Sequence, residues 1–209
     1  SYSVINGFLN FSLNAEYWLS FLNDALEVNQ YGYKAKNGEK MLIEYSSPNT
    51  NKPLHLGHIR NILLGWSCAK IHNALGYDVV KTQVINDRGI HICKSMVAWQ
   101  RFAKGATPAS TGTKGDKFVG DYYVAYNKEE KKQKAGLKEG EEPEILKAAR
   151  AMLLKWEEKD PEVIALWKKM NEWVFSGFAQ TYKRLGVHFD SENFESETYL
   201  LGKQHIADG

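Results

Sequence analysis

The chain has 209 residues, 43% hydrophobic and 25% charged, so it can form one large core or one domain with an appendage. Its formal net charge of +2 argues against wholesale coating of a polyanion, although it is compatible with local RNA contacts. No apolar run is long enough to cross a bilayer, and no basic segment leads into an apolar one at the N-terminus. We therefore expect no transmembrane helix and no secretory signal.

The two cysteines favour a reducing compartment. Cys68 and Cys93 lie in segments with helical patterns and do not form a C-x-x-C pair. Free thiols in a cytoplasmic protein are the expectation for such residues.

Residues 1–38 predict a small unit with little apolar surface to bury. Phe8–Leu13 alternates apolar and polar residues, as a short strand does. Asn14 can cap a following helix. The apolar face of that helix consists of Trp18, Leu22 and Leu26. One strand and one helix bury too little to fold alone, so we expect the last part of a larger unit, followed by a linker.

A strand, a long helix and a second strand are predicted over Met41–Tyr45, His55–Leu75 and Tyr77–Ile85. Such a βαβ unit pairs its strands in parallel through a right-handed crossover. The helix carries two apolar stripes on nearly opposite sides, namely Ile59, Ile62, Leu63 and Trp66, and Leu64, Cys68, Ile71 and Leu75. We therefore expect it to be buried on two sides, between the sheet and another layer.

The second half of the chain predicts further helices, over Ile90–Lys104, Glu144–Glu158 and Asp160–Leu185. The last begins with the cap, proline and acid of Asp160-Pro161-Glu162 and ends at Gly186.

Between these helices, three segments carry weaker signals. Gly105–Lys117 is rich in Gly, Thr, Ser, Pro and Ala and predicts a mobile loop. Phe118–Tyr126 predicts a helical turn or two. Asn127–Glu142 is mostly lysine and glutamate and predicts a solvated excursion.

The run Ile43–His58 is the most informative part of the sequence. It combines a strand, a polar turn and a helix that opens with His55-Leu56-Gly57-His58. Ligands collect at the carboxyl ends of parallel strands, where a helix N-terminus offers free N–H groups and a partial positive charge. His55 and His58 can face the same phosphate, and Gly57 lets a base or ribose approach closely. A nucleotide phosphate site is predicted here.

Two other interpretations apply to an isolated H-x-x-H pair. The histidines could be capping or surface residues, or they could bind a metal. Zinc would need a third ligand, and neither H-E-x-x-H nor a suitable Cys/His partner lies nearby in the sequence. We therefore expect no metal ligands.

The longer run E-x-S-S-P-N-x-N-K-P-L-H-L-G-H-x-R-N, from Glu44 to Asn61, resembles arginyl-tRNA synthetases. Its H-L-G-H part is similar to the H-I-G-H signature of all class I aminoacyl-tRNA synthetases. Three further runs, in the right order, resemble the same family: Tyr77–Val80 leading into Ile85–Gly89, then Leu185–Asp190, then Phe194–Glu197. The resemblance covers nearly the whole chain from Gly7 onward and is weakest between Ala103 and Glu142.

This resemblance implies an α/β fold with a Rossmann-like parallel sheet and a largely helical insertion. Residues 1–38 would be the remnant of an N-terminal tRNA-binding extension and a linker. Residues 39–126 would form the first half of the catalytic domain. Residues 127–209 would be a helical connective insertion that is cut short.

The resemblance also assigns an arginine pocket. Glu44 would contact the substrate's guanidinium, whose planar fork suits a carboxylate; the alternative is a surface acid on an edge strand. Asn49 would hold the amino acid portion, and Ser47 would line the same pocket. Asn86 and Asp87 would line the pocket or the path of the tRNA end, unless they form a plain turn.

For ATP, the resemblance implies contacts from His55, Gly57 and His58, with His58 nearer the reacting phosphate. Lys52 would add positive charge, unless it is a solvated lysine. The histidines would stabilise charge that develops at phosphorus. Mg²⁺ would accompany the ATP phosphates.

The implied activity is ATP-dependent formation of arginyl-adenylate and its transfer to tRNA(Arg), by a protein expected to be monomeric. The second phosphate-binding loop of the class, K-M-S-K-S, has no counterpart in the chain. We therefore expect a fragment of a synthetase that is inactive in aminoacylation by itself. Two alternatives stay open: another H-x-G-H nucleotidyltransferase, which would not need Glu44 with Asn49, and a non-catalytic synthetase-like module, which would not need its histidines intact.

Overall fold

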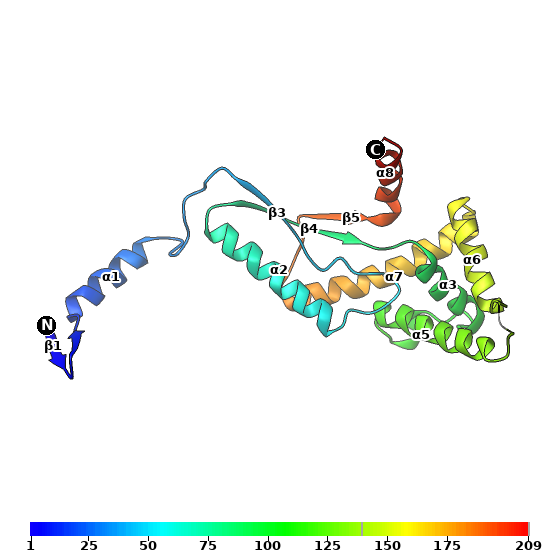
Figure 1. The fold of residues 1–209 in the computed structure, drawn as a ribbon, viewed down its shortest axis with the longest axis horizontal. Coiled ribbons are helices and arrows are strands. Elements are labelled where there is room, and N and C mark those ends of the chain that lie inside the picture. Colours follow the sequence, from blue (N-terminus) through cyan, green and yellow to red (C-terminus); the bar gives the residue numbers. More distant parts are fainter. Residues whose placement is uncertain (139, 209) are drawn as a thin grey trace.

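The computed structural model describes residues 1–138 and 140–208, which form an N-terminal extension, a parallel sheet and a helical region (Figure 1). The elements are β1 Tyr2–Ile5, β2 Phe8–Phe11, α1 Ala15–Glu27, β3 Lys40–Glu44, α2 Leu56–Ala74, β4 Asp78–Ile85, α3 Ile90–Phe102, α4 Pro108–Thr111, α5 Gly115–Lys134, α6 Glu144–Glu157, α7 Pro161–Leu185, β5 Ser191–Phe194 and α8 Glu195–Asp208. Among the described helices, none has the length and apolar character that crossing a bilayer requires.

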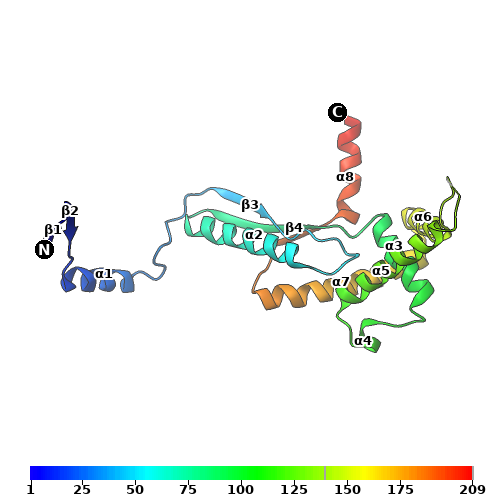
Figure 2. The same cartoon turned by 60° about the horizontal axis from the view of Figure 1, so that its bottom comes forward.

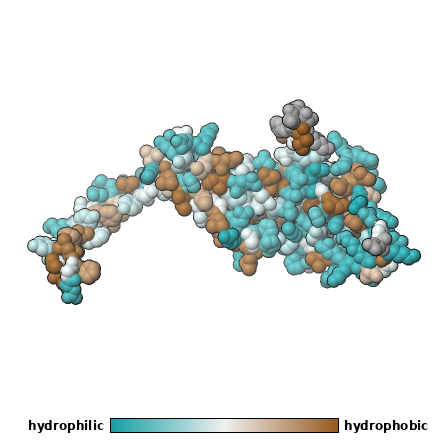
Figure 3. All heavy atoms as spheres, viewed as in Figure 1, coloured by the Kyte–Doolittle hydropathy of each residue, from teal (hydrophilic) through white to brown (hydrophobic). Residues whose placement is uncertain are grey.

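The N-terminal extension is a β-hairpin followed by α1, and it projects away from the rest of the chain (Figure 1). Asn6 and Gly7 both have positive φ, as the two central residues of a tight hairpin turn require. The sequence analysis predicted only the second strand and missed this turn signal. The predicted cap is confirmed, because Asn14 accepts a hydrogen bond from the Tyr17 amide at 3.0 Å. Figure 3 shows apolar side chains at the surface of the hairpin, where Phe8 and Phe11 are exposed.

The sheet has the order β3-β4-β5, and both pairs are parallel. Met41 lies opposite Val79, and Glu44 opposite Thr82. The predicted βαβ unit is therefore confirmed, with α2 as its crossover. Both α2 and α7 lie on the same side of the sheet (Figure 2). On the other side, the side chain of Leu42 is 68% exposed.

Helix α2 packs on the sheet through only one of its two predicted stripes. Ile62 is fully buried, while Gly65 comes so close to Tyr45 that a methyl group at Gly65 would overlap the Tyr45 side chain. The members of the second stripe, Leu64, Cys68, Ile71 and Leu75, are exposed. The expectation of burial on two sides is therefore wrong for the described chain, because an apolar stripe predicts only that a helix can be covered.

The helical region packs α3, α5, α6 and α7 around a shared core. Its buried side chains include Met96, Phe118, Tyr126, Ile145, Val174 and Phe178. Gly115 lies against the Trp173 backbone, and Gly177 against Asp116, so small residues bring α5 and α7 close together. The predicted helices Ile90–Lys104, Glu144–Glu158 and Asp160–Leu185 are confirmed to within about two residues at their ends.

One of the weaker predictions is wrong, and another is only partly right, since most of the described residues of 127–142 are exposed as expected. Gly105–Lys117 contains α4 and the start of α5, where we expected only a loop. Asn127–Glu142 begins as a continuation of α5, which runs to Lys134. Glu130 is 9% exposed there and pairs with Lys94 of α3 at 3.1 Å and with Lys134 at 2.9 Å. These ion pairs offset the cost of burying a carboxylate in a highly charged stretch.

Candidate functional site

The ends of β3 and β4 are joined side by side beyond the regular strands. Asn49 and Asn86 form an isolated parallel bridge. The Thr50 amide donates to the Asn86 carbonyl, and the Asn86 amide donates to the Pro48 carbonyl, both at 3.0 Å. The structure thus brings Asn49 and Asn86 together at the carboxyl edge of the sheet, where the sequence placed a ligand site.

Ser47 connects Glu44 to the neighbouring strand. Its hydroxyl donates to Glu44 Oε1 at 2.6 Å and accepts from the Val84 amide at 3.1 Å. One carboxylate oxygen of Glu44 is therefore held by Ser47, while the Glu44 side chain as a whole is exposed. A carboxylate oxygen has more than one lone pair, so a cationic ligand can still bind Glu44.

His55 and His58 cap α2, because each ring binds a backbone N–H group. The His55 amide donates to His58 Nδ1 at 3.2 Å, and the Gly57 amide donates to His55 Nδ1 at 3.1 Å. The ring centroids lie 4.0 Å apart. Since Nδ1 accepts in both residues, each neutral ring carries its proton on Nε2. The N-terminus of α2 therefore presents two Nε2–H donors, and the capping interpretation and the ligand interpretation are compatible.

His58 is the half-buried member of the pair. Burial lowers its pKa below the ordinary value of 6.5, and the nearby His55 and Lys52 lower the pKa further. Lys52 is thus close enough to act electrostatically on the His58 ring, as expected for two residues that contact the same ligand. A neutral His58 keeps its Nε2–H donor without adding a like charge beside Lys52.

The turn that precedes these histidines is supported by α5, which the sequence analysis did not foresee. Gly120 lies against Pro53, so that a methyl group there would overlap the proline ring and reach the Pro53 nitrogen at 3.3 Å. Thr50 Oγ1 and Asn51 Oδ1 are buried in the same turn and have no hydrogen-bond partner among the described residues. Their only sequence signal was their position between Asn49 and Lys52.

Asp87 binds the start of α8. Its carboxylate accepts from the Ser196 amide and hydroxyl, and its carbonyl accepts from Trp167 Nε1 at 2.6 Å. Asp87 is 2% exposed and borders a cavity of about 260 Å³ that Trp167 and Phe194 also line. Asp87 therefore fixes where β4, α7 and α8 meet, and it is more than a plain turn residue.

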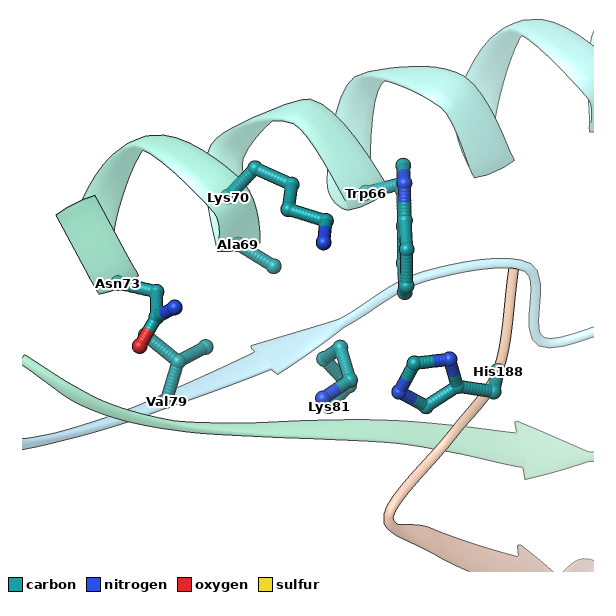
Figure 4. A pocket seen from close by; sticks show the side chains of 7 residues that line it. All are labelled: Trp66, Ala69, Lys70, Asn73, Val79, Lys81 and His188. Carbon is teal, nitrogen blue, oxygen red and sulfur yellow. The ribbon is translucent and has the colours of Figure 1, made fainter. Parts of the chain in front are cut away.

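A second cavity, of about 240 Å³, lies between α2 and β4 and is lined by Trp66, Lys70, Lys81 and His188 among others (Figure 4). Lys81 Nζ pairs with Asp190 at 2.7 Å, and Lys70 Nζ lies 5.0 Å from the centre of the Trp66 ring. Both lysines of this cavity therefore already have partners on the protein, Asp190 for Lys81 and the Trp66 ring for Lys70. It lies along the middle and carboxyl end of α2, away from His55 and His58.

The parallel sheet and its crossover helix have the fold of the catalytic domain of class I aminoacyl-tRNA synthetases. Residues 22–201 match the sequence family described as tRNA synthetases class I (R), catalytic domain. The chain belongs to this arginyl family, as its sequence motifs indicated.

Named relatives support the same conclusion. The arginine--tRNA ligase of Bacteroides fragilis is 52% identical over 219 aligned residues, which cover 100% of this chain and 37% of the relative. That of Amoebophilus asiaticus is 48% identical over 217 residues, covering 100% of this chain and 36% of the relative. The chain thus spans little more than a third of the length of these relatives.

Among solved structures, the Thermus thermophilus arginyl-tRNA synthetase matches with a TM-score of 0.67 and 26% identity, over 99% of this chain and 32% of that one. The Plasmodium falciparum arginyl-tRNA synthetase matches with a TM-score of 0.59 and 15% identity, over 99% of this chain and 35% of that one, which shows the fold alone. The predicted α/β fold class is confirmed.

Proposed function

We propose that this chain supplies the arginine-binding and ATP-binding part of an arginine--tRNA ligase. The observation that carries the proposal is that the Nδ1 atoms of His55 and His58 bind backbone N–H groups at the N-terminus of α2, which leaves both Nε2–H groups to donate. Glu44 at the end of β3 and Asn49 in the following turn lie a few residues earlier in the chain. An anion site and a cation site thus flank one short segment. ATP and arginine need such a pair of sites.

Glu44 is the proposed partner of the arginine guanidinium. Ser47 holds one of its oxygens, which limits the directions that the carboxylate can take and leaves lone pairs for a bidentate contact. Asn49 is the proposed contact for the amino acid portion, and its backbone is fixed by the bridge to Asn86.

His55 and His58 are the proposed phosphate contacts, with Lys52 adding positive charge and Gly57 leaving room for the nucleotide. Helix N-termini favour anions, and fixed donors stabilise charge that grows at phosphorus during adenylyl transfer. The arginine carboxylate attacks the α-phosphorus, pyrophosphate leaves, and arginyl-adenylate results without a covalent protein intermediate. Mg²⁺ enters with ATP as part of the substrate.

The second substrate is tRNA(Arg), whose terminal ribose takes the arginyl group. Asn86 and Asp87 are proposed to lie near its path, since they follow β4 at the same edge of the sheet. We further propose a cytoplasmic monomer in which residues 1–38 contact tRNA, residues 39–126 bind the small substrates and residues 127–209 form a connective insertion, from which β5 returns to the parallel sheet. Because the chain spans 37% of a relative's length, the chain alone is expected to bind ATP and arginine weakly and to aminoacylate little or not at all.

Arginine-dependent ATP–pyrophosphate exchange tests the proposal in the full-length protein. Arginine should support exchange, whereas lysine and citrulline should not, because citrulline lacks the positive charge that Glu44 requires. Replacing His58 with alanine should slow exchange by about 100-fold, the usual cost of losing one donor to a developing charge. His72→Ala, at the far end of α2, is the matched control and should leave the rate unchanged. Exchange that proceeds equally with any amino acid, or with His58→Ala, would contradict the proposal.

A further inference from the structure

Two consecutive serines follow β3 in an unusual backbone conformation. Ser46 has a φ of 70° and Ser47 a φ of 43°. A side chain in this left-handed region crowds its own carbonyl oxygen, so residues other than glycine adopt it only where other contacts hold them. The contacts that hold this turn therefore decide where Ser47 and its partner Glu44 lie.

Asn61 Nδ2 of α2 donates to the Ser46 carbonyl at 3.5 Å, and the Ser46 side chain is held by a buried series of hydrogen bonds that reaches α7. Ser46 Oγ lies 2.7 Å from Tyr182 Oη, and Tyr182 donates to Gln83 Oε1 at 3.1 Å. Gln83 Nε2 then donates to Glu192 Oε1 at 2.6 Å. Ser46, Gln83 and Tyr182 are 4%, 0% and 8% exposed, so water cannot readily replace these bonds.

The direction of this series follows from its proton count. Tyr182 has one hydroxyl proton, which goes to Gln83, so Ser46 must donate to Tyr182. Burial raises the pKa of Tyr182 to about 12, so the phenol stays protonated at neutral pH. The series of hydrogen bonds therefore runs in one direction: Ser46 donates to Tyr182, Tyr182 donates to Gln83, and Gln83 donates to the Glu192 carboxylate.

We propose that Tyr182 is a positioning residue for the arginine site: it holds Ser46 in the left-handed conformation, so that Ser47 aims the Glu44 carboxylate at the substrate. The proposal rests on the assignment of arginine to Glu44 made above. Tyr182 itself bonds to Ser46 and Gln83 and acts on Glu44 only through the turn. Tyr182 thereby couples helix α7 to the arginine pocket.

The first test is kinetic and uses pyrophosphate exchange by the full-length protein. Tyr182→Phe should raise the KM for arginine by about fivefold, the ratio that corresponds to one buried hydrogen bond, and leave the KM for ATP unchanged. Tyr126→Phe is the matched control, because Tyr126 is also buried and donates to the Ile145 carbonyl at 3.3 Å in the helical region. It should lower the melting temperature without changing either KM. An unchanged KM for arginine in Tyr182→Phe, or an equal rise for ATP, would overturn the proposal.

Substitutions of Ser46 distinguish two effects: loss of the left-handed turn conformation, and loss of the Ser46–Tyr182 hydrogen bond alone. Ser46→Ala loses the hydroxyl and keeps the strained φ, whereas Ser46→Gly loses the hydroxyl and adopts that φ freely. The KM for arginine should therefore rise in Ser46→Ala. In the double variant Ser46→Gly with Tyr182→Phe, the KM for arginine should return most of the way from the Tyr182→Phe value to that of wild type. If glycine performs no better than alanine, the left-handed turn is not what Tyr182 maintains.

A second readout does not depend on activity. The Val84 amide donates to Ser47 Oγ, so its hydrogen exchange reports the position of the turn. Tyr182→Phe should accelerate that exchange relative to Tyr126→Phe, and equal rates in the two variants would overturn the positioning role. If the wild-type protein shows no arginine-dependent ATP–pyrophosphate exchange, the proposed function is wrong. The hydrogen-exchange rate of the Val84 amide would still show whether Tyr182 holds the turn.

Discussion

Asp87 and Ser196 are joined by two hydrogen bonds to one carboxylate. The Ser196 amide donates to Oδ1 at 2.8 Å, and its hydroxyl donates to Oδ2 at 2.7 Å. Burial nevertheless raises the pKa of Asp87 above its ordinary value of 3.8, although the two bonds from Ser196 act in the opposite direction. The end of β4 is thus tied to the start of α8 by an acid whose charged form is costly to bury.

This relationship predicts a pH dependence of stability with a definite sign. Because the folded chain holds the Asp87 proton more tightly than the unfolded chain, the contribution of Asp87 to the free energy of unfolding falls as pH rises from 3.8 through the raised pKa. Asp87→Asn does not titrate. Urea unfolding from about pH 4 to about pH 7 should show wild type losing stability relative to Asp87→Asn. A difference that grows in favour of wild type would contradict the prediction.

Gly65 predicts a specific packing defect. Gly65→Ala should lower the free energy of unfolding by about 2 kcal/mol, because the new methyl group overlaps Tyr45 and forces α2 away from β3. Gly202→Ala is the control, since a methyl group there meets nothing within 4 Å, and the gain in helix propensity should leave stability unchanged or raised. Chemical denaturation of both variants measures the contrast. Equal stability of the two would show that α2 and β3 are less tightly packed than the structure indicates.

The electrostatics of the histidine pair are testable by NMR titration. His58 should titrate below 6.5, and Lys52→Met should move its pKa upward by removing a like charge. Lys70→Met, in the last third of α2, is the control and should not change the pKa of His58. Because the folded pKa is lowered, His58 contributes stability that is present above pH 6.5 and is lost as pH falls through the lowered pKa. A His58 pKa at or above 6.5 would contradict the burial of His58 and its closeness to His55 and Lys52.

The contact between α5 and the turn before α2 predicts an effect on catalysis from outside the site. Gly120→Ala should displace Pro53 and slow pyrophosphate exchange in the full-length protein by about tenfold, because small displacements of catalytic groups are costly. Gly136→Ala, just beyond the same helix, places its methyl group 3.8 Å from the nearest atom and should have no effect. Melting temperatures of both variants serve to exclude unfolding. A Gly120→Ala variant with a normal rate would show that α5 does not position the turn.

Local signals predicted much of the fold. Asn14 and Asp160 cap helices as expected, because a cap depends on backbone N–H groups two or three residues away. The parallel pairing of β3 with β4 followed from the strand, helix and strand pattern. The motif around His55 and His58 indicated the family.

The sequence by itself determined the bounds of α2, α3, α6 and α7 to within about two residues, because caps and apolar periodicity depend on neighbours a few positions away. It also predicted that β3 and β4 end at the same edge of one parallel sheet. Only the tertiary structure decided which stripe of α2 is covered, that α5 continues through Glu130 because Lys94 pairs with it, and that Tyr182 holds Ser46. Such contacts join residues that are far apart in sequence. Hydrophobic periodicity and motif spacing contain no information about them, because each contact forms only after the elements have packed.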